Sequence, residues 1–160
     1  MKFSNLIFPE LGPEVDKIDA KILEQLASDC RTGYAEISKA VNLSRMAVRA
    51  RVLKMVDSGV IQRFTVQLNA RKLGLSTSVF LEVNTVPAKL DKVASELTKN
   101  PKIESVYATT GSTTLHVHAF LENFNTLEKF IFNEIYQVDG ITDVNFHIMT
   151  KKYKGTRLFT

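Results

Sequence analysis

The sequence of 160 residues has no tryptophan, a single cysteine, four prolines and seven glycines. One cysteine cannot form an internal disulfide, and so few prolines and glycines exclude a collagen-like or largely disordered chain. No apolar run approaches the roughly 18 residues that a membrane-spanning helix needs. The opening residues, MKFSNLIFPELG, lack the pattern of a secretory signal. We therefore expect a cytoplasmic protein with no membrane partner.

The distribution of charge along the chain is informative. The formal net charge is +4. Residues 42–74 contain seven Lys or Arg and one Asp, whereas residues 75–160 contain nine basic and nine acidic residues. A local basic field beside a neutral remainder is typical of a segment that binds a polyanion such as nucleic acid. The alternative interpretation is an ordinary solvated helix face.

Apolar periodicity in the first half predicts three helices, over residues 17–28, 34–41 and 44–57. Asp16 is the expected N-cap of the first helix, and Ser44 that of the third. The second helix is expected to bury Ile37, Ala40 and Val41. Because the second and third helices are joined by a tight turn, the segment matches a helix-turn-helix.

The third predicted helix has two faces. Val48, Val52 and Met55 form an apolar stripe that docks on the other two helices, while Leu53 lies on the free face. The free face can enter a major groove, where arginine reads guanine and a helix N-terminus binds phosphate. The flanking Arg51 and Lys54 suit either a phosphate or a carboxylate. A wing-like segment adds Arg63, Arg71 and Lys72. The candidate DNA-binding residues are Ser44, Arg45, Met46, Arg49, Arg51, Lys54 and Arg63.

The second half alternates strands and helices. An apolar alternation predicts a linker strand at residues 64–68, followed by strands at 78–84, 103–109, 114–121 and 141–149. Helices are expected from Pro87 and from Asn125, the latter with Glu128 in capping-box spacing. The order β-α-β-β-α-β predicts a ferredoxin-like domain. The expected fold class is α+β: a winged helix-turn-helix domain, joined by a strand linker to a ferredoxin-like domain.

The expected organisation along the chain follows from these elements. It consists of an N-terminal extension (1–14), a helix-turn-helix domain (15–61), a linker (62–74), the ferredoxin-like domain (75–150) and a basic tail (151–160).

One face of the predicted sheet is apolar and suits a helical layer. It comprises Val79, Leu81, Val83, Leu115, Val117, Ala119, Leu121, Val144, Phe146 and Ile148. The opposite face is aromatic, with Phe80, Tyr107, His116, His118, Phe120 and Met149 mixed with Glu82, Asn145 and His147. So aromatic a face should not stay exposed to water. We therefore expect two copies of the chain to pair sheet against sheet.

The motifs resemble the Lrp/AsnC (feast/famine) family of transcriptional regulators. They are DKIDAKIL at 16–23, DCR at 29–31, YAEISKAVNLS at 34–44, V-x-x-R-V-x-x-M at 48–55, SGVI at 58–61 and L-x-x-x-x-L-G at 68–74. Their spacing is far more specific than that of a generic helix-turn-helix. Residues 75–150 resemble the effector domain of the family. Leu53 and Val56 are apolar where the family tends to be charged.

The resemblance implies a homodimer that assembles further, into an octamer, and binds A/T-rich promoter DNA. It also implies an amino acid effector at the loop between the second and third strands of the effector domain. In this chain those residues are Thr109, Thr110, Gly111, Ser112 and Thr114. The family commonly shows Gly-x-x-Asp here, whereas this chain has Thr114 in place of the aspartate that could bind an amino group. Effector sensing is thus either altered or lost.

Two other function classes are alternatives. An architectural protein that coats DNA with weak sequence preference would also use the basic helix. A small-molecule enzyme built on the ferredoxin-like domain would need a polar catalytic pocket, and no catalytic motif, cofactor loop or metal-ligand cluster is present. The histidines at positions 116 and 118 are expected to pack in the dimer interface rather than bind a metal. We therefore expect no catalytic residues, no metal and no cofactor.

Overall fold

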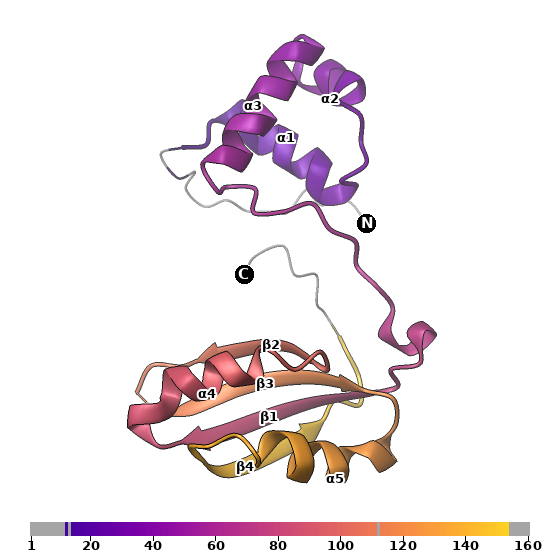
Figure 1. Ribbon diagram of the computed structural model, residues 1–160. Helices are drawn as coiled ribbons and strands as arrows, with labels where there is room; N and C mark the ends of the chain where they lie inside the picture. The colour runs from indigo at the N-terminus through magenta and orange to yellow at the C-terminus, as the bar shows by residue number, and fades with distance from the viewer. Residues whose placement is uncertain (1–11, 13, 112, 154–160) are drawn as a thin grey trace. The chain divides into compact units, whose positions relative to one another are not determined.

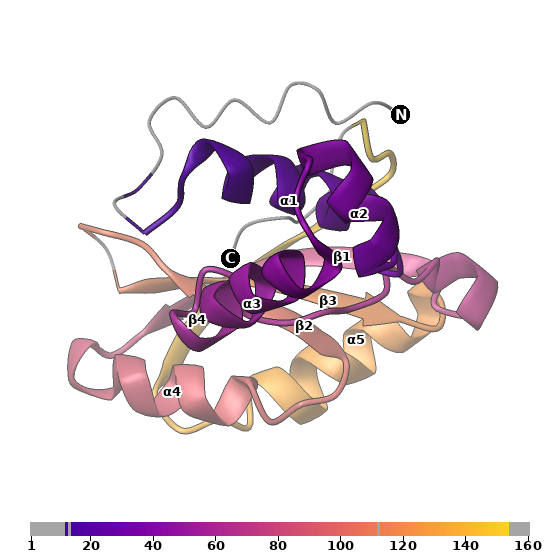
Figure 2. The same ribbon diagram turned by 90° about the horizontal axis from the view of Figure 1, so that it is seen from above.

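The computed structural model describes residues 12, 14–111 and 113–153 of the chain. It divides into two compact units, one helical and one built on a sheet (Figures 1 and 2). The division falls between Gln67 and Leu68, inside the segment expected to be a linker. Among the described residues, no helix is long and apolar enough to cross a membrane.

The helical unit consists of α1 (Lys17–Ser28), α2 (Tyr34–Val41) and α3 (Arg45–Asp57). Asp16 caps α1 and forms a capping box with Asp19, as its position predicts for the N-cap. The core contains Ile22, Leu26, Ile37, Val48, Val52 and Met55, all buried. One expectation is wrong: Ala40 is exposed, because Ile37 and the half-buried Val41 already fill the inner face of the short α2.

The predicted linker strand at residues 64–68 does not form, and this segment is extended coil. Phe64, Val66 and Leu68 are 50%, 70% and 68% exposed. A strand needs a neighbouring strand to accept its backbone hydrogen bonds, and the described part of the chain provides none here. A 3₁₀ turn at Ala70–Leu73 follows and ends at Gly74, whose φ of 88° is in the left-handed region.

The second unit is a four-stranded antiparallel sheet in the order β2-β3-β1-β4. Its strands are β1 (Thr77–Thr85), β2 (Ile103–Ala108), β3 (Thr114–Leu121) and β4 (Ile141–Ile148). Two helical segments, α4 (Leu90–Leu97) and α5 (Leu127–Phe130), lie on one face of the sheet (Figures 1 and 2). The expected α+β class, with helix-turn-helix followed by a ferredoxin-like domain, is confirmed.

The residues of the sheet alternate between its two faces, as predicted. The core between sheet and helices contains Val79, Leu81, Val83, Val93, Leu97, Leu115, Val117, Ala119, Leu121, Leu127, Phe130, Ile131, Ile135 and Val144. Phe146 and Ile148 were expected in this core, but they are 46% and 38% exposed. They pair with the buried Leu81 and Val79, so they lie on the helix-covered side. Because β4 is an edge strand, this end of it has a neighbouring strand on one side only.

The helical segment before β4 is irregular. A 3₁₀ turn at Phe124–Thr126 leads into α5, which continues as a π-helical turn at Ile131–Ile135. The predicted capping box of Asn125 with Glu128 is wrong, because Asn125 lies inside the 3₁₀ turn and no side chain caps α5. Burial of the apolar side chains of this segment in the core holds it against the sheet instead.

Candidate DNA-binding and effector sites

The turn between α2 and α3 aims the N-terminus of α3 outward. Asn42 adopts the left-handed conformation, with φ of 55°, and reverses the chain after α2. Ser44 then caps α3, since its Oγ accepts a hydrogen bond from the backbone N–H of Ala47 at 3.1 Å. The first turn of an α-helix has backbone N–H groups without a partner inside the helix, and such groups can bind an anion.

Helix α3 buries one side and exposes the other. Val48, Val52 and Met55 are at most 2% exposed and pack on α1 and α2. Arg45, Met46 and Arg49 are exposed on the free side. The structure therefore brings together, on one accessible face, the residues that were predicted to read bases.

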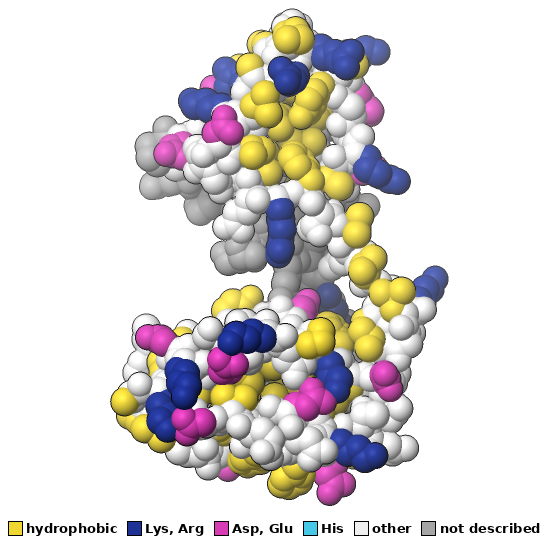
Figure 3. Space-filling view, in the orientation of Figure 1, with side chains coloured by type: hydrophobic (Ala, Val, Ile, Leu, Met, Phe, Trp, Pro, Cys, Tyr) yellow, Lys and Arg dark blue, Asp and Glu magenta, His cyan; other side chains and the backbone are white. Residues whose placement is uncertain are grey.

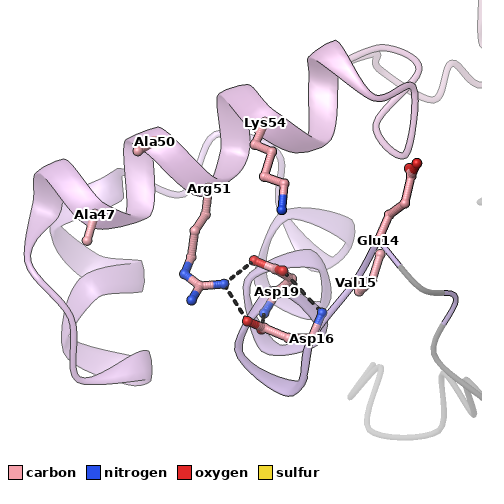
Figure 4. A pocket seen from close by; sticks show the side chains of 8 residues that line it. All are labelled: Glu14, Val15, Asp16, Asp19, Ala47, Ala50, Arg51 and Lys54. Carbon is pink, nitrogen blue, oxygen red and sulfur yellow. Dashed lines mark hydrogen bonds and ion pairs between the residues drawn. The ribbon is translucent and has the colours of Figure 1, made fainter.

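Arg51 points back at α1 (Figure 4). Its Nη1 donates to Asp16 Oδ2 at 2.7 Å and to Asp19 Oδ1 at 2.8 Å. The pKa of Asp16 falls from 3.8 to about 2, because its carboxylate accepts the backbone N–H of Asp19 and, secondarily, the Arg51 guanidinium. The sequence left either a phosphate or a carboxylate as the expected partner of Arg51, and in the structure its partners are these two carboxylates. It positions α3 against α1.

An open hollow of about 550 Å³ surrounds this ion pair. Lys54 projects into it and is exposed (Figure 4). The lining of the hollow has three acidic and two basic side chains, so the hollow does not favour an anion. Its lining residues are Glu14, Val15, Asp16, Asp19, Ala47, Ala50, Arg51 and Lys54.

Arg63 is exposed on the extended segment after α3. The same segment contacts the helical unit, where the Cys30 thiol lies 3.6 Å from the carbonyl oxygen of Thr65. Arg63 therefore lies beside the helices, although the predicted linker strand does not form. Cys30 is half-buried and free of disulfide bonds.

The effector loop is the hairpin between β2 and β3. Thr109, Thr110 and Gly111 are exposed, and Gly111 has a φ of 83°, which favours glycine. Thr114 begins β3, and its Oγ1 donates to Asn84 Oδ1 at 2.6 Å. Ser112, the remaining predicted effector residue, lies outside the described residues.

Two polar residues near this loop were missed in the sequence. Asn84 on β1 pairs with Thr114 on one side and with Asp143 on the other. Asn84 Nδ2 lies 3.5 Å from Asp143 Oδ2, and Asn145 Nδ2 lies 3.3 Å from the same oxygen. The carboxylate of Asp143 on β4 therefore lies two strands away from Thr114 on β3, with Asn84 on β1 between them. Only the pairing of distant strands reveals this, and no local pattern signals it.

The face of the sheet that the helices leave open carries all three histidines of the chain. His118 is held at both ring nitrogens, with Nδ1 at 2.5 Å from Glu104 Oε2 and Nε2 at 2.8 Å from Ser78 Oγ. His116 packs against Phe80, with ring centroids 5.4 Å apart. His147 is not on a strand adjacent to the other two. No group of three or more potential ligands for a metal occurs in the described part of the chain.

Two family models match the two units separately. Residues 15–56 match the AsnC-type helix-turn-helix domain, and residues 78–159 match the Lrp/AsnC ligand binding domain. An HTH-type transcriptional regulator from Pyrococcus horikoshii is 35% identical over 148 residues, which are 91% of this chain and 94% of that protein. The regulator LrpA of the same organism is 34% identical over 140 residues, 88% of this chain and 99% of LrpA.

Solved structures show the same fold. A Neisseria meningitidis transcriptional regulator, in complex with L-methionine, has a TM-score of 0.84 at 26% identity, over 91% of this chain and 96% of that one. Escherichia coli AsnC has a TM-score of 0.83 at 23% identity, over 89% and 96%. The two family models and the relatives that are at least 30% identical over nearly their whole length show the family. The chain belongs to the Lrp/AsnC family of HTH-type transcriptional regulators.

Proposed function

We propose that this regulator binds specific DNA sites through α3 and that a small metabolite, an amino acid or a close relative, modulates it. The observation that carries the proposal is the exposed, capped N-terminal half of α3, with Arg45 and Arg49 on its free side. An arginine fork can donate two hydrogen bonds to a guanine, which makes this pair suited to base readout.

The remaining basic groups suit the phosphates. The N-terminus of α3 beside Ser44 can bind a phosphate oxygen, and the side chains of Lys54 and Arg63 are exposed. Phosphate contacts supply affinity and salt dependence, whereas base contacts supply sequence preference. Arg51 is left out of the proposed contact surface because α1 engages its guanidinium.

Substitution of Arg49 tests the base-reading role. We expect Arg49→Ala to weaken binding at the preferred site by roughly 1–3 kcal/mol and to relax the preference there. Fluorescence anisotropy with the preferred duplex and with a random duplex measures both effects. Lys129→Ala removes the same charge from α5 and is the control. Equal loss on the two duplexes would reduce Arg49 to a phosphate contact.

A homodimer would place two copies of α3 in major grooves one helical turn, or a multiple of it, apart. Two features support dimerisation. Phe80, His116 and Phe120 lie on the open face of the sheet, where a second sheet can cover them. The extended segment at residues 64–68 exposes apolar side chains in strand-like alternation and needs a pairing partner. Assembly of dimers into an octamer belongs to the same proposal.

The effector proposal rests on the match to a ligand-binding domain and on the exposed loop around Gly111. A thermal-shift titration against the twenty amino acids, several amines and β-amino acids tests it. A ligand at a hundredfold excess over its Kd stabilises the native state by about 2.7 kcal/mol. A shift with one compound identifies the effector, and no shift across the panel contradicts regulation by these compounds.

An architectural role, with weak sequence preference and no amino acid effector, is the second candidate. Thr114 favours it, because a hydroxyl that already donates to Asn84 replaces the carboxylate that could bind an amino group. The ratio of affinities for a preferred and a random duplex separates the two candidates.

A further inference from the structure

The exposed side of α3 is not purely basic. Met46 is 67% exposed and Leu53 41% exposed, and Ala50 between them is exposed as well. Positions i, i+4 and i+7 fall on one line along a helix, and this line faces away from the buried stripe of α3. Figure 3 shows hydrophobic side chains gathered on the surface of the helical unit, with Lys and Arg and some Asp or Glu side chains around them. An apolar line on an exposed helix indicates a contact surface.

The charges beside this line indicate what it contacts. Arg45 and Arg49 lie along one side of it and Lys54 along the other. Asp57, at the C-terminal end, is the one acidic residue within α3. Positive charge on both sides of an apolar line complements a groove whose walls carry phosphates and whose floor carries apolar groups.

The major groove of DNA offers one such apolar group, the C5-methyl of thymine. We propose that Met46 and Leu53 read thymine methyl groups. This inference rests on the proposed function, since it requires that α3 enters a major groove. Seven residues along an α-helix span about 10 Å, which is about three base steps of 3.4 Å. Met46 and Leu53 therefore contact thymines about three base pairs apart in each half-site.

Deoxyuridine substitution tests the proposal, because uracil lacks only the methyl group. A preferred duplex is first selected from a random library with the full-length chain. Each thymine is then replaced singly by deoxyuridine, and the Kd is measured by fluorescence anisotropy at fixed salt. We expect about a fourfold loss of affinity for each methyl group that is buried, at two positions in each half-site.

Variants assign each methyl group to its reader. Met46→Ala should abolish the thymine-over-uracil preference at one position, and Leu53→Ala at the other. Arg49→Ala is the matched control: it should weaken binding while the ratio of thymine to uracil affinities stays unchanged. Both apolar side chains are exposed, so thermal unfolding should show these variants folded.

The outcomes distinguish a failure of this proposal from a failure of the proposed function on which it rests. If the library yields no preferred duplex, sequence-specific binding itself fails. If a duplex is selected but uracil binds as well as thymine everywhere, or if both variants keep the preference, methyl readout is wrong. A smaller oligomer for Met46→Ala or Leu53→Ala in light scattering would instead make the apolar line an interface between copies, and would also overturn the proposal.

Discussion

Arg51 shows how a single side chain can leave the recognition surface although its position lies within a basic helix. Its guanidinium contacts two carboxylates on and before α1, one of them the buried Asp19. Breaking this contact would remove the positive charge that offsets the desolvation of the buried Asp19 carboxylate, which would keep its hydrogen bond from the backbone N–H of Asp16. The residue orients α3 rather than touching what α3 binds.

The pH dependence of the helical unit reports the carboxylate of Asp16, which caps α1 and also pairs with Arg51. The pKa of Asp16 is lowered from its ordinary value of 3.8 to about 2. The ionised carboxylate therefore stabilises the folded state at pH values above 3.8. That stabilisation is lost as the pH falls from about 4 towards 2. We expect Asp16→Asn, which keeps a capping oxygen, to make the loss of stability in this range shallower than in the parent.

Chemical denaturation monitored by circular dichroism at a series of pH values measures the difference. Asp139→Asn is the control, because the pKa of Asp139 is also lowered, by Lys89 and Lys92, but in the other unit. Identical pH profiles for the parent and Asp16→Asn would contradict the assignment.

At the scale of elements, substitutions at Ser44 can separate two features of the N-terminus of α3: the side-chain cap of the helix and the proposed phosphate contact. Ser44→Ala removes the cap and should lower the free energy of unfolding by about 1 kcal/mol. Ser44→Asp keeps a capping oxygen and adds a negative charge that favours a helix N-terminus. If a phosphate binds there, Ser44→Asp should be stable yet bind DNA more weakly than Ser44→Ala.

Thermal unfolding and anisotropy on the same preparations measure stability and affinity together. DNA binding by Ser44→Asp as tight as in the parent would show that no phosphate approaches this helix end.

The helices and sheet strands were predictable from local pattern, and the failures have physical causes. Asp16, Ser44 and the strand alternations depend on neighbours within a few residues, so the sequence contains what is needed. The linker strand failed because its apolar alternation has no pairing partner in the described chain. The Asn125 cap failed because α5 starts through a 3₁₀ turn, whose hydrogen bonds the spacing rule does not consider.

The candidate sites differ in the same way: residues placed by local periodicity were predictable, and residues brought together by distant strands were not. The exposed face of α3 follows from helical periodicity, so Arg45, Met46 and Arg49 could be placed from the sequence. The neighbourhood of Thr114 could not, because Asn84 and Asp143 reach it only through pairing between strands far apart in the chain.

At the scale of the molecule, the open sheet face is the proposed dimer interface. Phe80 lies on its central strand, between His118 on β3 and His147 on β4. We expect Phe80→Asp to convert the dimer to a monomer, because a charge there would be buried without a partner. Sedimentation or light scattering measures the mass, and near-native circular dichroism would show that the fold is retained.

Phe132→Asp is the matched control, since Phe132 is 57% exposed and lies on the helical side of the same unit. A dimer that survives Phe80→Asp but dissociates with Phe132→Asp would place the interface on the helices instead.

The measurement that tests the account most directly is the ratio of affinities for a selected duplex and a random duplex of equal length. It should be made with the full-length chain at physiological salt, where non-specific phosphate contacts weaken. A regulator that reads bases through α3 should prefer the selected duplex by a factor of about 10³ or more. A ratio near one would contradict base readout and favour an architectural protein that coats DNA.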